Sequence, residues 1–543
     1  MRFAAFLFIF CAFSCVNCRK SSTSNDAGVV SAPKEWLDGT PVVDTATPQQ
    51  GGTLVVRVMT EPGTLNFLEG AARESWTSRM TRNLVVESLL DIDPVSFDLV
   101  PSLAQTWVDS EDHRTTTLTL RSGVRFHDGS PFTSADVVAV LDAVKNPIKN
   151  TSSVRADFDE LLSWKAPDAT TVELHWSHPS PFSLRALAKL PILPASALAG
   201  DWAQLGAKPI GTGPYAVEKW ERGQSLTLKR VDRSRGQLDA IVYRFVKDAT
   251  VASGLFDRGE LDLMTNVQPT LWKELEQSPR AVSEVIRLKG IDNSYSYIAW
   301  NEAVPALADY RVRRALAHLY PREAIEKTVD LKLEQPTTCP FWYPSPSCDP
   351  TVEAISFSPE AARQELLDAG FIESAQGVLT RDGQPLTLRF LMPATSVRLA
   401  KVTQMLQDQF HRIGAELTIE TVDISHMSAR VTARDFEVVS RVWTELDAVQ
   451  DQFGTFHSSQ IDGGANFVRY SSARADALME AIRSEWDAEK RHALERSLHR
   501  QLYFDQPYVF MTSRASLDLA KRRVHGLTPS PLWYDLRRVW VEH

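Results

Sequence analysis

Three carboxylates follow a tryptophan at the end of an apolar segment. Residues 438–442 have the composition of a buried strand, Trp443 comes next, and Glu445, Asp447 and Asp451 follow it. Two neighbouring carboxylates can act as the acid and base of a glycosidase. They can also hold a ligand beside the indole ring, or belong to an ordinary strand-to-loop exit. The distance between the carboxylates depends on the fold, so all three interpretations stay open at this point.

A second candidate is a glycine-rich segment with the letters of a dinucleotide fingerprint. Gly211, Gly213 and Ala216 have the spacing G-x-G-x-x-A, and Asp232 lies about twenty residues further on. The fingerprint requires a helix whose N-terminus meets the pyrophosphate. Residues 215–231 instead alternate with a period of two and contain a turn signal, which predicts a hairpin. We therefore expect the glycines to form a tight bend between strands.

Other catalytic and metal-binding patterns are missing from the sequence. His175 and His178 are three residues apart in a segment that alternates like a strand, so they face opposite sides and are not expected to share a metal. The sequence has no HExxH, GxSxG or Walker motif. We expect no metal, no cofactor and no catalytic residue. A secreted hydrolase that uses the acids near Trp443 is kept as the alternative.

The composition is that of a soluble globular protein with more than one hydrophobic core. The chain has 543 residues, of which 43% are apolar and 23% charged, and its formal net charge is -9. A chain of this length exceeds the size at which one core stops growing, so two or three domains or lobes are expected. The negative charge argues against a general nucleic-acid or anionic-membrane binder.

The N-terminus, residues 1–18, is typical of a secretory signal. One arginine precedes an apolar run that is shorter than the roughly 20 residues of a membrane-spanning helix. Cys15 and Cys18 close this run, and a cysteine in that place resembles a bacterial lipobox, where the thiol is lipidated. The alternative is a cleaved signal with incidental cysteines. Residues 19–50 are rich in Ser, Thr, Pro, Gly and Asp and predict a flexible tether.

Beyond the signal only Cys339 and Cys348 remain, and they bracket a proline-rich loop. In an exported protein this pattern favours one short disulfide that stiffens the loop. A metal site would need further ligands at suitable spacing, and none stand nearby. Two free thiols are the alternative.

Strand-like and helix-like segments alternate along the chain, which predicts an α/β or α+β architecture. One helix carries clear boundary signals. Ser358 is an N-cap candidate, Pro359 fits the first helical position, and Gly370 fits the end of the helix.

Several segments together resemble one protein family. They are GGTLVVRVMTEPGTLNFL, VRFHDGSPFTSADVV, IGTGPYAVEKW, YRVRRALA, SPEAARQELLDAGF, VWTELDAVQDQFGTFHSSQ and DQPYVF. Their order and spacing resemble the family 5 extracellular solute-binding proteins of ABC transporters, the oligopeptide, dipeptide and nickel binders. The resemblance covers residues 51–543.

The resemblance implies a two-lobed α/β fold of the periplasmic-binding-protein type II, in the large cluster with an extra subdomain. Lobe 1 would comprise residues 51–290 and 508–543, with 85–208 as the extra subdomain, and lobe 2 would comprise 291–507. The chain would cross between the lobes near 290 and 507, and these crossings would form the hinge.

The resemblance also implies where charged groups of a peptide would bind. Trp443 and Thr444 match the family, but Leu446 stands where peptide-binding members have the aspartate that takes the free amine. Asp447 lies one step late and Glu445 one step early, and a one-residue bulge could bring Asp447 into place.

The expected partner of a peptide carboxylate is an arginine in the loop before the long helix of lobe 2. Here that loop contains only Arg398, which is displaced toward the helix. Arg441, inside the strand before Trp443, is the other candidate; a paired or snorkelling surface arginine is its alternative.

Aromatic and loop residues complete the expected site. Trp443 is expected to line the cleft, with a core position as its alternative. Tyr295, Tyr297 and Trp300 match the strand that enters lobe 2, and the two tyrosines share one face, so both line the cleft or both belong to the core. The loop that contains Glu61 and Asn66 matches the lobe 1 loop that meets the ligand backbone; a simple turn is the alternative.

The resemblance implies the substrate-binding lipoprotein of an ABC importer. It would be a monomer, exported to the periplasm and lipid-anchored through Cys18 or Cys15. It would capture a small solute, by default an oligopeptide or dipeptide-like molecule, by lobe closure and deliver it to permease subunits and their ATPase. Opines, oligosaccharides and nickel complexes stay open as solutes.

Overall fold

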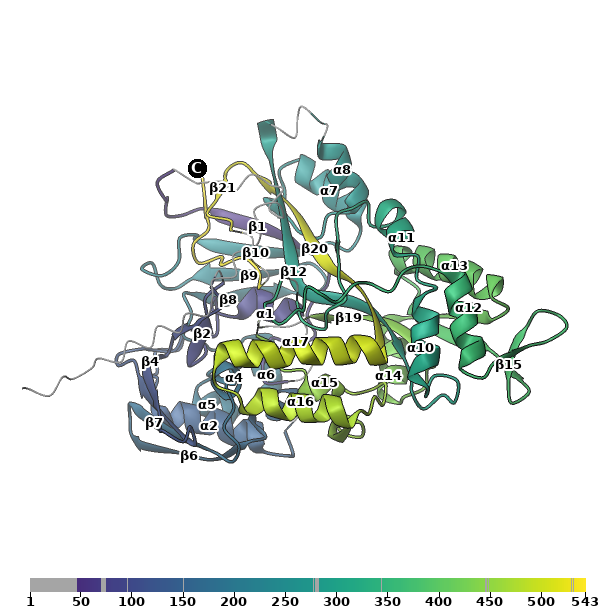
Figure 1. Ribbon diagram of the computed structural model, residues 1–543. Coiled ribbons are helices and arrows are strands. Elements are labelled where there is room, and N and C mark those ends of the chain that lie inside the picture. Colours follow the sequence, from purple (N-terminus) through teal and green to yellow (C-terminus); the bar gives the residue numbers. More distant parts are fainter. Residues whose placement is uncertain are drawn as a thin grey trace, which may run out of the picture.

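A long mixed sheet runs through the computed structural model from one end of the molecule to the other (Figure 1). The structure describes residues 46–543 apart from 70–74, 95, 150, 277, 279–282, 343, 445–446, 448, 529 and 531. The predicted signal with Cys15 and Cys18, the tether up to residue 45, and Glu445 therefore lie outside the described residues.

The order of the strands in this sheet is β18-β17-β19-β12-β20-β11-β1-β10-β9-β8, and β13 pairs with β20 as well. The strands span β1 Thr53–Val58, β8 Tyr215–Glu221, β9 Ser225–Arg230, β10 Ala240–Phe245, β11 Leu263–Met264, β12 Val285–Trp300, β13 Gln335–Pro336, β17 Thr387–Pro393, β18 Glu416–Val422, β19 Val438–Thr444 and β20 Tyr508–Lys521. We call the part built on β11, β1, β10, β9 and β8 lobe 1, and the part built on β18, β17 and β19 lobe 2.

Two long antiparallel strands, β12 and β20, connect the lobes. Their pairing extends from Val285 opposite Lys521 to Ala299 opposite Tyr508, with register shifts between Ile291 and Tyr297. Residue 290, one of the predicted crossings, lies within β12, and residue 507, the other, directly precedes β20. The predicted domain boundaries themselves stay predictions.

A separate four-stranded sheet in the order β4-β5-β7-β6 forms a subdomain beside lobe 1. Its strands are β4 Ala104–Asp109, β5 Thr115–Leu120, β6 Leu161–Asp168 and β7 Thr171–Trp176; its helices are α2 Ser134–Lys145, α3 Ser152–Arg155, α4 Ser183–Lys189, α5 Ala195–Leu198 and α6 Trp202–Ala207, with the short 3-10 turn Ala156–Phe158. Apolar side chains of this subdomain and of lobe 1 belong to one buried cluster, so the two form a continuous core.

Helices cover both faces of the sheet in lobe 2. One face packs on α10 Tyr310–Ala317, α11 Arg322–Thr328, α12 Pro359–Asp368 and α13 Val397–Arg412. The other face packs on α14 Ile424–Thr432, α15 Phe453–Phe456, α16 Ala473–Ser484 and α17 Ala488–Asp505. In Figure 1, α16 and α17 extend across the molecule toward the subdomain.

The remaining elements are short. Lobe 1 carries α1 Ser75–Thr81, α7 Ala249–Asp257, α8 Pro269–Glu276 and the strand pairs β2 Leu90–Ile92 with β3 Leu99–Pro101 and β21 Val524–His525 with β22 Trp540–Val541. Lobe 2 carries β14 Ile372–Glu373, β15 Leu379–Arg381, β16 Gln384–Pro385 and the 3-10 turn Ser458–Gln460. Within the described part of the chain, no helix has the length and apolar character needed to cross a membrane.

Local signals in the sequence account for individual boundaries. The Oγ of Ser358 accepts a hydrogen bond from the backbone N of Ala361, and α12 begins at Pro359, as predicted. Gly370, just beyond this helix, has a φ of +95°, a conformation that glycine adopts without a steric penalty. The predicted start and end of this helix are confirmed.

The glycine pair that imitates a dinucleotide fingerprint is a backbone crossing. A Cβ on Gly211 would lie 1.9 Å from the carbonyl oxygen of Val85, and one on Gly213 would lie 2.3 Å from that of Leu84. A strand, β8, follows the glycines and pairs with β9 as a hairpin. The expectation of a tight bend before a hairpin is confirmed, and the glycines are required because two chain segments touch here.

Candidate functional site

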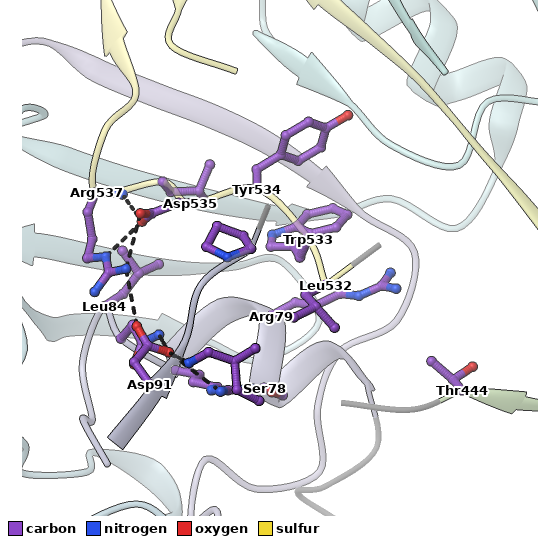
Figure 2. Close-up of a pocket in the computed structure, with 15 residues that line it drawn as sticks. Ser78, Arg79, Leu84, Asp91, Thr444, Leu532, Trp533, Tyr534, Asp535 and Arg537 are labelled. Carbon is purple, nitrogen blue, oxygen red and sulfur yellow. Dashed lines mark hydrogen bonds and ion pairs between the residues drawn. The ribbon is translucent and has the colours of Figure 1, made fainter. Parts of the chain in front are cut away.

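A cavity of about 90 Å³ opens on lobe 1 where it faces the end of β19 (Figure 2). A cavity of this size has room for one group of a larger solute. Thr444, at the end of β19, contributes the lobe 2 side. The lobe 1 side comes from α1, from the segment between α1 and β2, and from the C-terminal segment: Ser78, Arg79, Arg82, Asn83, Leu84, Asp91, Ile92, Pro94, Leu532, Trp533, Tyr534, Asp535, Leu536 and Arg537.

Arginines and aspartates alternate along the wall of this cavity. Arg82 lies 3.6 Å from Asp91, and Arg537 lies 3.4 Å from Asp91 and 2.7 Å from Asp535. Burial lowers the pKa of Arg82, although Asp91 opposes that shift. The wall therefore holds several desolvated charges that are balanced against one another, which gives it fixed donors and acceptors for a polar group.

The ring of Trp533 lies against the guanidinium of Arg79, with 4.9 Å between the guanidinium carbon and the ring centroid. Arg79 also contacts Asp292 of β12 at 3.3 Å. The backbone of Trp533 has a φ of +96°, which is rare for a bulky residue and costs conformational energy. The fold thus holds an indole at the cavity in a strained conformation, a feature that clusters at ligand sites.

An aromatic cluster lines the face of lobe 2 that carries Trp443. Tyr297 stacks on Trp443 with 6.2 Å between ring centroids and on Tyr508 with 4.2 Å. Tyr295 is paired with Trp443 in the β12–β19 ladder, so all these rings project from one face of the sheet. Burial raises the pKa of Tyr297 and of Tyr508.

The members of this cluster differ in exposure. Tyr295 and Tyr297 are 2% and 1% exposed and belong to the core between the sheet and α14–α17. Trp443 is only partly buried and packs at the edge of that core, one residue before Thr444. The two tyrosines do not line the cavity described above, and Tyr297 stacks on the indole of Trp443.

Trp300 points to the opposite face of β12. It packs with Phe390, Leu406 and Phe410 in the second core of lobe 2 and is 3% exposed. Residues 297 and 300 differ by an odd number of positions, so in a strand they cannot share a face. The structure therefore places Trp300 in the core, away from the cavity.

The lobe 1 loop is fixed by hydrogen bonds to lobe 1 itself. The carboxylate of Glu61 accepts hydrogen bonds of 2.9 Å from Trp220 Nε1 and from the backbone N of Gly223. Asn66 is buried, and its Oδ1 accepts a hydrogen bond from the backbone N of Leu68. Both side chains hold the turn in shape, and neither lines the cavity.

Asp447 is engaged in an ion pair between the lobes. Its two carboxylate oxygens accept hydrogen bonds of 2.5 and 2.7 Å from Nε and an Nη of Arg185, on α4 of the subdomain. The backbone N of Val449 donates a third, at 3.0 Å. Burial alone would raise the pKa of Asp447, but Arg185 outweighs it and holds the pKa below its usual value. Three protein donors already engage this carboxylate, so the structure gives no support to Asp447 as the group that binds a solute amine, and that role stays a prediction.

The two candidate arginines of lobe 2 have different surroundings. Arg398 makes a bidentate pair with Asp330, with bonds of 2.6 and 2.8 Å, and lies 3.4 Å from Glu334. It is thus committed to two carboxylates and is not poised for a solute carboxylate. Arg441 lies opposite Tyr297 in the β12–β19 ladder and is half-buried beside the aromatic cluster.

Cys339 and Cys348 form a disulfide, and their loop packs on lobe 1. Trp342, inside this loop, is buried with the lobe 1 core and meets Phe97 edge-on, with 5.2 Å between ring centroids. Among the residues that the structure describes, no group of three or more His, Cys, Asp or Glu side chains is arranged to hold a metal ion.

Sequence reasoning missed the cavity residues of lobe 1 and the partner of Asp447. Arg79 and Arg82 are three residues apart on α1 and the turn after it, a spacing that places two arginines on one helix face and could have been noticed. Trp533 lies between prolines and acids in the C-terminal segment and carries no local signal. Arg185 lies 262 residues from Asp447, so only the fold brings them together.

The residues 98–462 match the family model described as bacterial extracellular solute-binding proteins, family 5 Middle. The chain is a member of family 5 of the bacterial extracellular solute-binding proteins. This confirms the family that the sequence motifs indicated, the oligopeptide, dipeptide and nickel binders of ABC transporters.

Known proteins support the same assignment. The chain is 27% identical over 519 residues to the oligopeptide-binding protein AppA of Bacillus subtilis, covering 91% of this chain and 90% of that one. The structure of AppA in complex with a nonapeptide superposes with a TM-score of 0.80 at 25% identity, over 92% of this chain and 100% of the other. NikZ of Campylobacter jejuni in complex with Ni(L-His) superposes with a TM-score of 0.78 at 22% identity, over 90% and 99%.

These neighbours are two-lobed periplasmic binding proteins of mixed α/β content, so the predicted fold class is confirmed. The family and the relatives named here are binding proteins of transporters.

Proposed function

We propose that this protein is the substrate-binding component of an ABC importer and that it captures peptides by closure of its two lobes. The observation that carries the proposal is the cavity at the seam between lobes, lined by lobe 1 and by Thr444 of β19. A cavity walled by both lobes is enclosed only when they meet, which couples solute binding to closure. Membership of the solute-binding family and likeness to an oligopeptide-binding protein support the same reading.

The peptide would be held by shape and by fixed polar groups at the seam. We assign to it Thr444 and the Arg79–Trp533 wall, which line the cavity, together with Trp443 and Arg441, which precede Thr444 on β19 and do not line the cavity themselves. Asp447 and Arg398 are both paired within the protein, so neither end of a zwitterionic dipeptide gains a strong charge partner there. An oligopeptide with several backbone and side-chain contacts is therefore the preferred solute class.

The same observation supports a second candidate solute class. If no side chain of the site binds the charged termini of a peptide, a small solute without a free amine fits the cavity as well. Opines, oligosaccharides and nickel complexes belong to this class. A secreted hydrolase is the alternative of another kind, and it would release cleaved products from a peptide mixture.

Native mass spectrometry of the chain purified without denaturant tests the proposal. We expect an adduct of peptide mass that dissociates on denaturation and returns after incubation with a mixed peptide library. Unmodified masses of the returned peptides exclude turnover, whereas shortened peptides indicate the hydrolase. Failure to retain any peptide from the library, with retention of a non-peptide adduct, would overturn the peptide assignment.

The proposal includes export and a lipid anchor on Cys18 or Cys15, with delivery of the solute to permease subunits and their ATPase. Metabolic labelling with a radioactive fatty acid, in cells that express the Cys15→Ser and Cys18→Ser variants, tests the anchor. The label should be lost from one of the two single variants. Label on both single variants and on the double variant would refute the anchor at this position.

A further inference from the structure

Lobe 1, with its subdomain, and lobe 2 touch at several points that involve no solute. At the first point, Arg185 of α4 makes its bidentate pair with Asp447, and the side chains are 12% and 3% exposed. The same guanidinium donates a 2.7 Å hydrogen bond to the backbone O of Phe97. The pair is therefore desolvated and joined on both sides to fixed groups.

The second and third contacts are aromatic. Trp342 of lobe 2 is buried against Phe97 of lobe 1. His113, in the turn between β4 and β5, stacks on Trp486, in the turn between α16 and α17, with 3.7 Å between ring centroids and 8° between planes. Phe182, just before α4, packs in turn against the lobe 2 core. Each lobe thus inserts an aromatic side chain into the other.

The Asp447 segment is itself held in register by lobe 2 and the hinge strand. Asn293 of β12 donates a 2.6 Å hydrogen bond to the backbone O of Asp447, and its Oδ1 accepts one of 3.1 Å from Gln450. Gln450 in turn accepts a 3.0 Å hydrogen bond from the backbone N of Trp342. One network therefore links the hinge, the ion pair and the aromatic contact at Trp342.

We propose that Arg185 and Asp447 form a clasp that stabilises the closed form of the protein and keeps Asp447 from reading a cationic group of the solute. This inference rests on the proposed closure of the lobes. It adds that contacts between the lobes, as well as the solute, stabilise the closed form. Arg185 occupies the carboxylate in the way that a guanidinium or ammonium group of a ligand would.

The physical reason is the difference between a paired and an unpaired buried charge. A buried carboxylate that keeps its arginine is compensated, whereas one that loses it must stay desolvated without a partner or regain water. Opening of the lobes returns water to Asp447. Loss of Arg185 therefore shifts the equilibrium between closed and open forms toward the open form, while each lobe keeps its own core.

Small-angle X-ray scattering on the solute-free full chain tests the clasp. Solute is removed by dialysis in denaturant before refolding, and circular dichroism verifies the fold. For the wild-type chain we expect the radius of gyration calculated from this structure, in which the lobes are in contact. For Arg185→Met we expect a larger value, with the open form favoured at least tenfold more than in the wild type.

Two further variants make the result specific. Arg523→Met removes another bidentate arginine–aspartate pair, 2.8 and 3.0 Å from Arg523 to Asp262, that lies within lobe 1 and has a more exposed arginine. It should leave the radius of gyration unchanged. The double variant Arg185→Met/Asp447→Leu has no unpaired charge and should scatter more like the wild type than Arg185→Met does.

Several outcomes would overturn the clasp. They are an open wild-type chain in the absence of solute, equal scattering of Arg185→Met and wild type, or equal expansion of Arg523→Met and Arg185→Met. Because scattering needs no solute, these outcomes are separate from the mass-spectrometric test of the proposed function. A chain that closes through the clasp but retains no peptide would refute the peptide assignment alone.

Discussion

Removal of the disulfide between Cys339 and Cys348 should destabilise the protein without opening the lobes. The disulfide closes a loop across a sequence separation of nine residues. In the chain-entropy description, a closed loop of about ten residues restricts the unfolded chain enough to stabilise the native state by about 2.7 kcal/mol. The double variant Cys339→Ser/Cys348→Ser should lose about that free energy of unfolding.

The native loop should stay in place, because other contacts hold it. Gln452 donates a 2.9 Å hydrogen bond to the backbone O of Pro340, the Oγ of Ser347 donates one of 2.5 Å to Glu495, and Nδ1 of His499 accepts one of 2.9 Å from the backbone N of Asp349. Each such bond contributes about 1 kcal/mol net. Together with burial of Trp342 in the same loop, worth about 3 kcal/mol, they exceed the effect of the disulfide.

The measurement is a pair of experiments on the double variant and the wild type. Urea unfolding should show a lower midpoint for the double variant, by an amount equal to the lost free energy divided by the measured slope. Small-angle scattering should show the same radius of gyration for both proteins. An unchanged midpoint would refute the entropic argument. An expanded variant would show that the disulfide itself holds the loop on lobe 1.

Three further predictions concern single residues. Trp443→Ala should weaken binding of the solute identified by mass spectrometry at least tenfold with little change in the urea midpoint; unchanged affinity removes Trp443 from the site. Burial lowers the pKa of His499 to about 4. Above about pH 6.5 its neutral ring therefore contributes about 3 kcal/mol to the free energy of unfolding, and this contribution is lost as the pH falls toward 4. His499→Gln should flatten the loss of stability between pH 6.5 and 4 in urea titrations, and an unaltered pH profile contradicts the assignment. Burial raises the pKa of Glu302 to about 8 against the opposing effect of Arg313, so its protonated form stabilises the fold below about pH 4.5 and the contribution disappears as the pH rises through 8. In Glu302→Gln the unfolding free energy should decline less than in the wild type from pH 5 to 8, and a parallel decline refutes the reasoning.

Features with a local cause could be predicted from the sequence. The start of α12 follows from two residues. The side chain of Ser358 accepts a hydrogen bond from a backbone N–H of the first turn, and Pro359 has no backbone N–H that would be left without a partner there. The bend at Gly211 and Gly213 follows from the alternating pattern of β8 behind it. The shared face of Tyr295 and Tyr297 follows from the period of a strand. In each case the residues that decide the outcome are close together in the chain.

Features that depend on the meeting of distant segments could not be predicted. Asp447 was expected to face a solute, because an acid after a strand end has no partner visible in the sequence. Its partner Arg185 lies 262 residues away on the subdomain. Arg398 is paired with Asp330, 68 residues away, for the same reason. Trp300 has the large aromatic ring expected of a cleft residue. Only the packing of α10–α13 on its face of the sheet shows that it lies in the core.

The two ion pairs together limit how this protein can recognise a solute. Asp447 and Arg398 are the acid and the base that would best match the ends of a zwitterionic chain, and each already meets a bidentate partner. To bind either side chain, a solute would have to displace its present partner, Arg185 or Asp330. The displaced charge would be left buried and unpaired, and the free-energy cost of that exceeds the stabilisation from an exposed ion pair. We therefore expect recognition to come from Trp443 at the end of β19 and from the cavity wall of lobe 1. Both surfaces would tolerate variation in the ends of the solute and would select for its shape, which agrees with the proposed binding of oligopeptides of differing sequence.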